Sequence, residues 1–440
     1  MMYWRIAKGI LCVSICAVSG IVEAAIPPDS LFLTVDQLFE RGIENSLQLK
    51  ADRLQSAMIG ERVKTASSMK LPDVQIGLKG GVIGQPVVYQ HGLSGATYPD
   101  TPDWSQNYAI DFTQPLYEGG QIRYAVKKAK LEQQAMSLQT NVHRSDLKLN
   151  LLEQYMELFS LYKQYEVLSR NIEESELRLH DIRRMKREGL ITNNDVLRSE
   201  MQLTHDRLSL TEAGNNIRLV SQRLDILLGI QEDCLLKPDT ALLSVPVMLG
   251  EYEGYVSEAC RNAPSVVWLR KQTELARNEI KGIRAASLPK LSLYASNTLA
   301  RPISRTMTDL YNNNWNIGVS LSYPLSSLYK NNHKRKESQL AVHARLNEEE
   351  LQLQQIRMEV KTAYLRHQEA VEEVEALRLS VRQAEENYRI MQNRYLNQLA
   401  ILTDLLDANT VRLNAELQLV HARTRVVYTY YQLQKVCGRL

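Results

Sequence analysis

The stretch from Leu353 to Tyr395, LQQIRMEVKTAYLRHQEAVEEVEALRLSVRQAEENYRIMQNRY, places an apolar residue at almost every third or fourth position. Steps that alternate between three and four residues have the period of a left-handed coiled coil. Of the thirteen positions in this seam, twelve are apolar: Leu353, Ile356, Val360, Ala363, His367, Ala370, Val374, Leu377, Val381, Ala384, Tyr388, Met391 and Tyr395. We expect the exception, His367, to be a histidine tolerated in a helix interface rather than a ligand or a pH switch.

This seam lies in one of two very long segments without proline, Gly120 to Glu188 and Lys330 to Asn397. Each would form a helix of roughly 100 Å, which exceeds the width of a globular core. A return helix should follow each one, from Asn194 to Leu228 and from Asp404 to Val436. The first segment carries a looser copy of the seam, 209 residues earlier: Leu147, Leu151, Leu158, Leu161, Tyr165, Leu168, Ile172, Leu179 and Ile182.

The offset of 209 residues recurs elsewhere, so the chain is an internal duplication. Gln114-Pro115-Leu116 returns as Tyr323-Pro324-Leu325 at this offset, whereas Leu71-Pro72 returns as Leu288-Pro289 after 217 residues. The first copy therefore holds eight extra residues, which fit a loop in the Gly/Pro-rich stretch Gly80 to Pro102.

The duplication sets the domain organisation. We expect the first copy at residues 25–230, the second at residues 250–440, and an extended linker with two prolines at residues 231–249. Basic residues, an apolar stretch and small residues before Ala25 predict a secretory signal peptide at residues 1–24.

Within each copy the apolar period also changes to two, which predicts one β-hairpin per copy. The alternating residues of the first copy are Val74, Ile76, Leu78, Tyr108, Ile110 and Phe112. Those of the second copy are Leu291, Leu293, Ala295, Trp315, Ile317, Val319, Leu321 and Tyr323. Helices from Asp36 to Met69 and from Gly254 to Ser287 should precede the hairpins and continue the return helices end to end.

The apolar hairpin faces allow two interpretations. A tilted transmembrane strand needs roughly 9 to 11 residues, and four strands cannot close a barrel, so several chains would have to share one. Alternatively, the two hairpins pack face to face as a small soluble sandwich. The predicted export signal and the helix lengths favour the membrane, as do aromatic residues near the expected strand ends: Trp104, Tyr108, Trp315 and Tyr323.

Composition and motifs narrow the class of function. The 53 Lys and Arg residues nearly balance the 50 Asp and Glu residues, and a net charge of +3 is too small to suggest a nucleic-acid partner. The sequence holds no HExxH motif, P-loop or nucleophile elbow, so we expect no enzyme, no cofactor and no metal site. Beyond the predicted signal peptide the cysteines are Cys234, Cys260 and Cys437, an odd and widely spaced set that predicts no disulfide framework.

The sequence resembles the TolC family of outer membrane efflux proteins. The resemblance covers nearly the whole chain after the predicted signal peptide, and its most specific motifs are Gln114 to Gly120, Gly189 to Asp195 and Thr403 to Ala408. It implies a mainly α-helical homotrimer in which each chain gives four strands to a twelve-stranded transmembrane β-barrel, continued by a long periplasmic coiled-coil α-barrel. It also implies an outer membrane exit duct that passively conducts drugs, metals or proteins. A periplasmic adaptor and an inner-membrane transporter of the RND or ABC class are the implied partners.

Asp404 and Asp407 lie three residues apart, hence on one helix face, directly after the turn that ends the longest helix. Residue chemistry alone favours a structural role, because acids in a first turn complement the helix dipole and Thr403 or Asn409 could cap or solvate them. The resemblance implies instead that both aspartates narrow the periplasmic entrance, as a ring of six carboxylates in a trimer.

The first copy differs at this turn, since Asp195 matches Asp404 but Arg198 replaces Asp407. Gly189 follows a basic helix end and predicts a helix C-cap. By the resemblance, both turns are tips that an adaptor grips, at Gly189, Leu190, Asp195, Gln398 and Leu399.

Two positions depart from the family pattern. Gln398 stands where the family usually has glycine, and Ala400 replaces a basic residue that helps to hold the entrance shut, so the resemblance leaves open whether a salt bridge locks this entrance. Lysines and an arginine at the starts of the long helices are expected on a solvated face, with contact to outer membrane lipid as the alternative: Lys127, Lys128, Lys130, Lys330, Lys334, Arg335 and Lys336. An exported coiled-coil scaffold without a channel is the alternative function.

Overall fold

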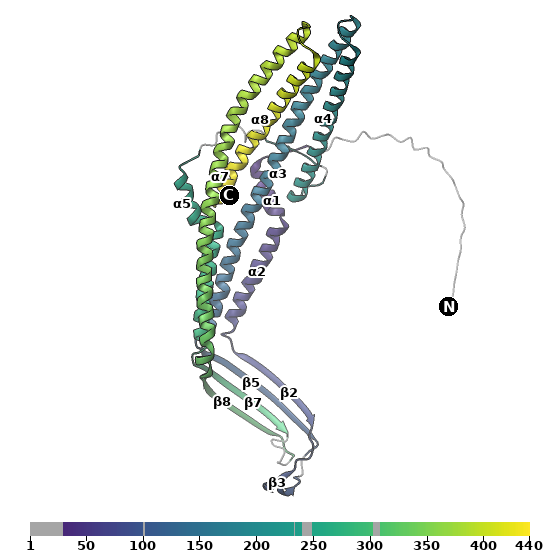
Figure 1. The fold of residues 1–440 in the computed structure, drawn as a ribbon. Coiled ribbons are helices and arrows are strands. Elements are labelled where there is room, and N and C mark those ends of the chain that lie inside the picture. The colour runs from purple at the N-terminus through teal and green to yellow at the C-terminus, as the bar shows by residue number, and fades with distance from the viewer. Residues whose placement is uncertain (1–29, 100–101, 233, 240–248, 302–308) are drawn as a thin grey trace, which may run out of the picture.

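A computed structural model describes residues 30–99, 102–232, 234–239, 249–301 and 309–440. The predicted signal peptide and Pro246 of the predicted linker lie outside these residues. The described chain is elongated and mostly helical, with long helices reaching one end and a β-sheet at the other (Figure 1).

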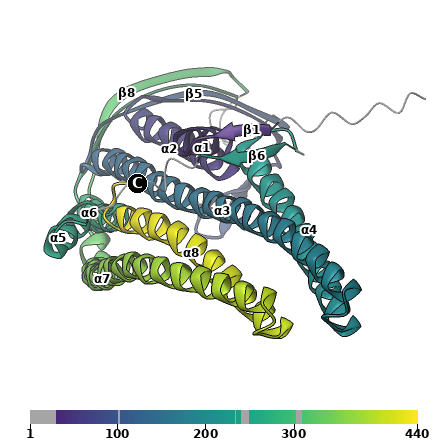
Figure 2. The same cartoon turned by 90° about the horizontal axis from the view of Figure 1, so that it is seen from above.

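Two helical hairpins form the long arm. In the first copy α3 (Gln121–Arg187) turns back into α4 (Asn193–Leu228), and in the second α7 (Ser326–Leu396) turns back into α8 (Leu402–Val436). Seen end-on, the helices lie in the order α4, α3, α8, α7, so the two copies meet where α3 packs on α8 (Figure 2). The 71 residues of α7 span about 105 Å, which confirms the predicted length.

The predicted seam of α7 is its buried face. All thirteen positions from Leu353 to Tyr395 are buried or half-buried, and His367, 1% exposed, places Nδ1 3.0 Å from Thr429 Oγ1. The first-copy seam is correct except at Tyr165, which is 40% exposed. Because α3 packs against both α4 and α8, it buries a wider strip of residues than one seam predicts.

Each helix expected before a hairpin is two helices, which corrects the single helices predicted from Asp36 to Met69 and from Gly254 to Ser287. The structure has α1 (Val35–Asn45) and α2 (Leu47–Ser68) in the first copy, and α5 (Tyr252–Asn262) and α6 (Pro264–Ala285) in the second. Ser46 accepts a hydrogen bond from Leu49 N and caps α2. Proline opens α6, at a position where a backbone N–H has no helical partner.

The second members, α2 and α6, continue the return helices as predicted. Asn45 Nδ2 donates to Leu228 O over 2.7 Å, so α2 carries on where α4 ends. Gly229, at φ +64°, is required at this joint, because a Cβ atom there would lie 2.7 Å from Asn45 Cγ. At the joint between α8 and α6, a Cβ on Gly438 would lie 2.9 Å from Asn262 O.

A small parallel sheet lies beside the middle of the arm, where β1 (Ser30–Leu33) pairs with β6 (Leu235–Pro238). Tyr155 on α3 joins this sheet to the helices: its hydroxyl donates to Leu33 O over 2.7 Å and accepts from Asp239 N over 2.6 Å. Burial raises the pKa of Tyr155 to about 12, so the hydroxyl stays protonated and able to donate.

The two predicted hairpins lie edge to edge in one antiparallel sheet, which excludes the face-to-face sandwich. The strands are β2 (Asp73–Val82), β5 (Trp104–Glu118), β7 (Lys290–Arg301) and β8 (Asn312–Ser322), in the order β2-β5-β7-β8. The stretch predicted as a plain loop from Gly80 to Pro102 is wrong in part, because it contains a short hairpin of β3 (Val88–His91) and β4 (Ser94–Thr97).

One face of the four-stranded sheet exposes large apolar side chains. The register confirms the alternation, since Ile76 lies opposite Ile110 and Leu293 opposite Val319. Trp104 begins β5, whereas Trp315 lies inside β8 rather than at a strand end, and it is 71% exposed. A large apolar face that is exposed among the described residues is typical of a surface that meets a membrane or another protein.

Among the described helices, none combines the length and the hydropathy needed to cross a bilayer.

Candidate functional site at the helical tips

Two tight turns form the far end of the arm, one between α3 and α4 and one between α7 and α8. In the first turn Gly189 N donates to Lys186 O over 3.0 Å and Leu190 N to Met185 O over 3.0 Å. In the second turn Gln398 N donates to Tyr395 O over 3.0 Å and Leu399 N to Arg394 O over 2.7 Å. Both are Schellman motifs, which satisfy the last carbonyls of a helix.

The residue at the centre of each motif has a left-handed backbone. Gly189 has φ +76°, as its predicted role of C-cap requires, and Gln398 has φ +60°. In the part of the chain that the structure describes, Gln398 is the non-glycine residue with positive φ. A side chain in this region costs roughly 1–2 kcal/mol, so the second tip carries backbone strain that the first does not.

The helix that leaves the first tip is capped by side chains. Thr192 N donates to Asp195 Oδ2 over 3.0 Å, and Asp195 N donates to Thr192 Oγ1 over 3.4 Å, which together form a capping box. Thr192 Oγ1 also donates to the same carboxylate over 2.7 Å. The carboxylate of Asp195 is therefore held against the start of α4.

The helix that leaves the second tip has no such cap. Ile401 is the N-cap residue of α8, and no side chain caps the backbone there. Asp404 and Asp407 are both exposed, while Leu405 and Ala408 beside them are buried. The two carboxylates thus share the outward face of the first turns of α8.

Thr403 and Asn409 do not cap or solvate these aspartates, which corrects that expectation. Thr403 Oγ1 accepts from Arg198 Nη1 over 2.6 Å, a contact between the two tips. Asn409 is 2% exposed and donates to Asn171 Oδ1 on α3.

The two tips also differ in charge. Residues 183–198 carry five basic residues and two acids, whereas the matching residues 392–407 carry one basic residue and two acids. Some basic residues of the first tip pair within their own hairpin, since Arg183 contacts Glu200 over 2.6 Å and Arg184 contacts Asp181 over 3.6 Å. The second tip is the acidic one, as predicted from the sequence.

Tyr395 connects the second hairpin to the first tip. It is 5% exposed, and burial together with the nearby Asp195 carboxylate raises the pKa of its hydroxyl. Tyr395 and Tyr388 line a cavity of about 420 Å³ between α3, α7 and α8. An apolar cluster from all four helices surrounds these rings and includes Ile182, Leu203 and Leu405.

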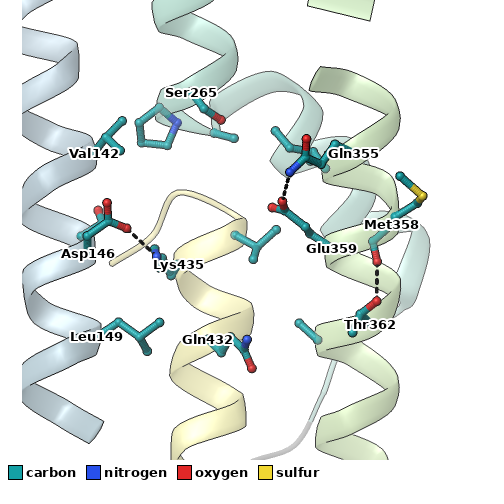
Figure 3. A pocket seen from close by; sticks show the side chains of 16 residues that line it. Val142, Asp146, Leu149, Ser265, Gln355, Met358, Glu359, Thr362, Gln432 and Lys435 are labelled. Atoms are coloured by element: carbon teal, nitrogen blue, oxygen red, sulfur yellow. Dashed lines mark hydrogen bonds and ion pairs between the residues drawn. The ribbon is translucent and has the colours of Figure 1, made fainter. Parts of the chain in front are cut away.

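A second cavity, of about 630 Å³, lies at the joint between α8 and α6, lined also by α3 and α7 (Figure 3). Four of its charged or amide side chains are paired with one another: Asp146 contacts Lys435 Nζ over 2.5 Å and Gln355 donates to Glu359 over 2.9 Å. Across the described residues, no group of three or more His, Cys, Asp or Glu side chains is placed to hold a metal ion.

Comparison with known proteins gives a consistent result. Residues 38–230 and 255–439 match the family of outer membrane efflux proteins. The chain is 21% identical over 421 residues to the outer membrane protein TolC of Escherichia coli strain K12. The aligned region covers 92% of this chain and 82% of TolC.

Solved structures share the fold. CusC superposes with a TM-score of 0.77 at 14% identity, covering 92% of each chain. The outer membrane protein VceC of Vibrio cholerae gives 0.74 at 18% identity, covering 92% of this chain and 96% of VceC. The MtrE outer membrane channel of Neisseria gonorrhoeae gives 0.72 at 17% identity, covering 92% of this chain and 88% of MtrE.

Proposed function

The chain belongs to the outer membrane efflux protein family, and we propose that it is the exit duct of a tripartite efflux or type I secretion system. It is an outer membrane protein with a long helical extension, and this family consists of efflux channels rather than enzymes. In this proposal the duct conducts small molecules such as drugs or metals, or proteins, passively from its helical tips to the outside.

The single observation that carries the proposal is a four-stranded sheet with an exposed apolar face and two free edges. Among the described residues β2 and β8 each pair on one side only. A sheet edge is not tolerated in hydrocarbon, so a lone chain cannot insert stably. Three chains would supply twelve strands, which is enough to close a barrel. The helical hairpins would then extend the barrel as a tunnel into the periplasm.

The tips are the proposed periplasmic end. There Asp404 and Asp407 of three chains would form six carboxylates at the entrance, supported by their exposure and by the absence of a side-chain cap that would engage Asp404. Such a ring would attract cations and filter charge. Because Gln398 and Ala400 carry no positive charge, a salt bridge from these positions would not hold the entrance.

Partner contacts belong to the same end. We assign the docking of a periplasmic adaptor to Gly189, Leu190, Asp195, Gln398 and Leu399, and expect an inner-membrane RND or ABC transporter behind it. Leu190 is 47% and Leu399 is 69% exposed, which supports apolar contact with a partner. Residues 1–24 as signal peptide, 25–230 and 250–440 as the repeats, and 231–249 as an equatorial linker remain predictions.

The proposal is tested on the purified full-length protein. We expect a trimer that migrates faster on gels without heating than after boiling, stays with membranes after an alkaline or urea wash, and forms pores in planar bilayers. Release by the wash as a peripheral protein, or the absence of conductance, would contradict the duct and favour an exported coiled-coil scaffold.

A further inference from the structure

A continuous chain of hydrogen bonds crosses the interior of the tip region and touches all four long helices. Its six residues form what we name the inter-hairpin bridge. Each of the six is more than nine-tenths buried: Asn171, Ser175 and Arg178 on α3, Asp206 on α4, Tyr388 on α7 and Asn409 on α8. The bridge combines two opposite buried charges with neutral polar groups.

One end of the bridge lies on α7. Arg178 Nη1 donates to Tyr388 OH over 2.9 Å, and Arg178 Nη2 donates to Ser175 Oγ over 2.6 Å. Ser175 Oγ donates in turn to Asp206 Oδ2 over 3.1 Å. One hydroxyl group therefore connects a buried guanidinium to a buried carboxylate, which also accepts from Gln202 Nε2 over 2.8 Å.

The other end of the bridge lies on α8. Asn171 Nδ2 donates to Asp206 Oδ2 over 3.0 Å, and Asn409 Nδ2 donates to Asn171 Oδ1 over 3.0 Å. Asn409 is seven residues after the start of α8 at Leu402, or about 11 Å along the helix. It therefore fixes the helix segment that carries both entrance aspartates.

Arg412 closes the bridge from the side. Its Nη2 atom donates to Asn409 Oδ1 over 2.9 Å and forms an ion pair with Glu174 of α3. Its guanidinium lies 4.1 Å from the centre of the Tyr388 ring. The α8 end and the α7 end are thus joined to each other as well as to α3.

The bridge connects the α3/α4 hairpin with the α7/α8 hairpin of the same chain, and the duplication does not repeat it. The offset of 209 residues places Ser380, Ala384 and Ala415 at the positions of Asn171, Ser175 and Asp206. Alanine side chains form no hydrogen bonds, so the second copy cannot build the same bridge toward a neighbouring chain. The polar connection exists between the two hairpins of one chain and is not repeated by the other copy.

We propose that the six bridge residues are positioning residues for the entrance, holding the first turns of α8, with Asp404 and Asp407, on the α3/α4 hairpin. The inference rests on the proposed function, because the aspartates form an entrance only in a duct.

The substitution Asn171→Leu tests the positioning role from the far side of the bridge. Asn171 lies on α3, and its side-chain oxygen accepts a hydrogen bond from Asn409 Nδ2 on α8, which leucine cannot accept. In the full-length trimer in detergent, hydrogen exchange of the amides of residues 402–409 should rise about tenfold. The Mg²⁺ concentration that half-blocks the pore in planar bilayers should rise by about threefold or more, because the six carboxylates are no longer held together.

Two further variants make the result specific. Arg183→Ala removes the pair with Glu200 inside the first hairpin, and it should leave both the exchange of α8 and the Mg²⁺ block unchanged. Tyr388→Phe removes only the hydroxyl that accepts from Arg178, so it should assemble even if Asn171→Leu does not, and it should raise exchange in α8 to a smaller degree.

A rise in exchange confined to α3 and α4, with an unchanged Mg²⁺ block, would overturn the positioning role. The same holds if Tyr388→Phe changes neither quantity. A parent protein without any conductance would instead contradict the proposed duct, and the exchange measurement would still decide whether the bridge holds α8.

Discussion

The two helical tips have the same backbone turn built from different residues. Both helix ends close with a Schellman motif, around Gly189 in the first copy and Gln398 in the second. The next helix begins with a capping box at Thr192 in the first copy and without a side-chain cap at Ile401 in the second. The first tip is relaxed and basic, and the second is strained and acidic.

This difference shows that an acid in the first turn of a helix does not have a fixed meaning. Asp195 and Asp404 occupy matching positions, yet the Asp195 carboxylate accepts from Thr192 while α8 offers Asp404 no such partner at its N-cap. The first acid stabilises its helix, and the second remains exposed. The capping residue three positions earlier decides which applies.

The largest expected effect comes from exchanging the central residues of the two turns. Gly189→Gln places a side chain at φ +76° and should destabilise the first tip by roughly 1–2 kcal/mol. Gln398→Gly removes the strain at φ +60° and should stabilise the second tip. The gain should not exceed about 1 kcal/mol, because glycine also raises the conformational entropy of the unfolded chain. Hydrogen exchange of the tip amides measures both. If both substitutions destabilise their tips, or both stabilise them, the two turns do not differ in strain.

The next effect concerns the caps. Thr192→Ala deletes the capping box and should raise the exchange of the first amides of α4 by an amount that corresponds to about 1 kcal/mol. Ile401→Ala is the matched control, at an exposed position without a side-chain cap. It should change the free energy of opening of the first turn of α8, as measured by exchange, by less than about 0.5 kcal/mol. If the control costs as much as Thr192→Ala, the caps are not what distinguishes the tips.

Ile401→Thr should convert the second tip toward the first. Threonine at the N-cap can accept from the Asp404 backbone and donate to its carboxylate, as Thr192 does with Asp195. We expect α8 to gain about 0.5–1 kcal/mol in exchange protection, and the Mg²⁺ block of the pore to weaken because Asp404 is drawn into the cap. A gain in protection with an unchanged block would separate Asp404 from the proposed entrance ring.

The smallest effect is a pH dependence near the second tip. Burial raises the pKa of Glu416 on α8, although Arg412 and Arg170 oppose the shift, and Glu385 and Glu174 add to it. The folded state therefore binds the proton of the Glu416 carboxyl more tightly than the unfolded state does. This protonation stabilises the folded protein at low pH, and the stabilisation is lost as the pH rises through the raised pKa.

Lowering the pH from about 7 to about 5 should therefore increase the exchange protection of α8 slightly, after correction for intrinsic rates. Glu416→Gln, which cannot titrate, should lose that increase. A gain of the same size in Glu416→Gln would assign the pH dependence to other groups.

The long-range order of the fold was predictable from the sequence because period and duplication are local signals repeated many times. The seam from Leu353 to Tyr395 specifies the buried face of α7, including His367. The break between α1 and α2 was missed, and so was the break between α5 and α6, although Pro264 marks the second one. Asn45 followed by Ser46 was the available signal, since Ser46 caps α2 and Asn45 bonds to the end of α4.

The candidate site was predictable only in part. The exposed Asp404 and Asp407, and the glycine turn at residue 189, follow from spacing and turn chemistry. The inter-hairpin bridge does not, because Asn171 and Asn409 are 238 residues apart and a polar residue on a seam does not reveal its partner. The predicted burial of Tyr165 was wrong for a related reason, since two neighbouring helices, α4 and α8, determine which face of α3 is buried.

The central claim, that the acidic second tip forms the entrance of a duct, is tested most directly by Mg²⁺ block of single pores in planar bilayers. In the double variant Asp404→Asn and Asp407→Asn, we expect the half-blocking concentration to rise by about tenfold or more, because six carboxylates are lost per trimer. Asp195→Asn, the matching acid of the first tip, should leave it unchanged, since Thr192 still caps α4 and the asparagine oxygen can still accept from Thr192 N. An unchanged block in the double variant, or an equal change in Asp195→Asn, would contradict the account.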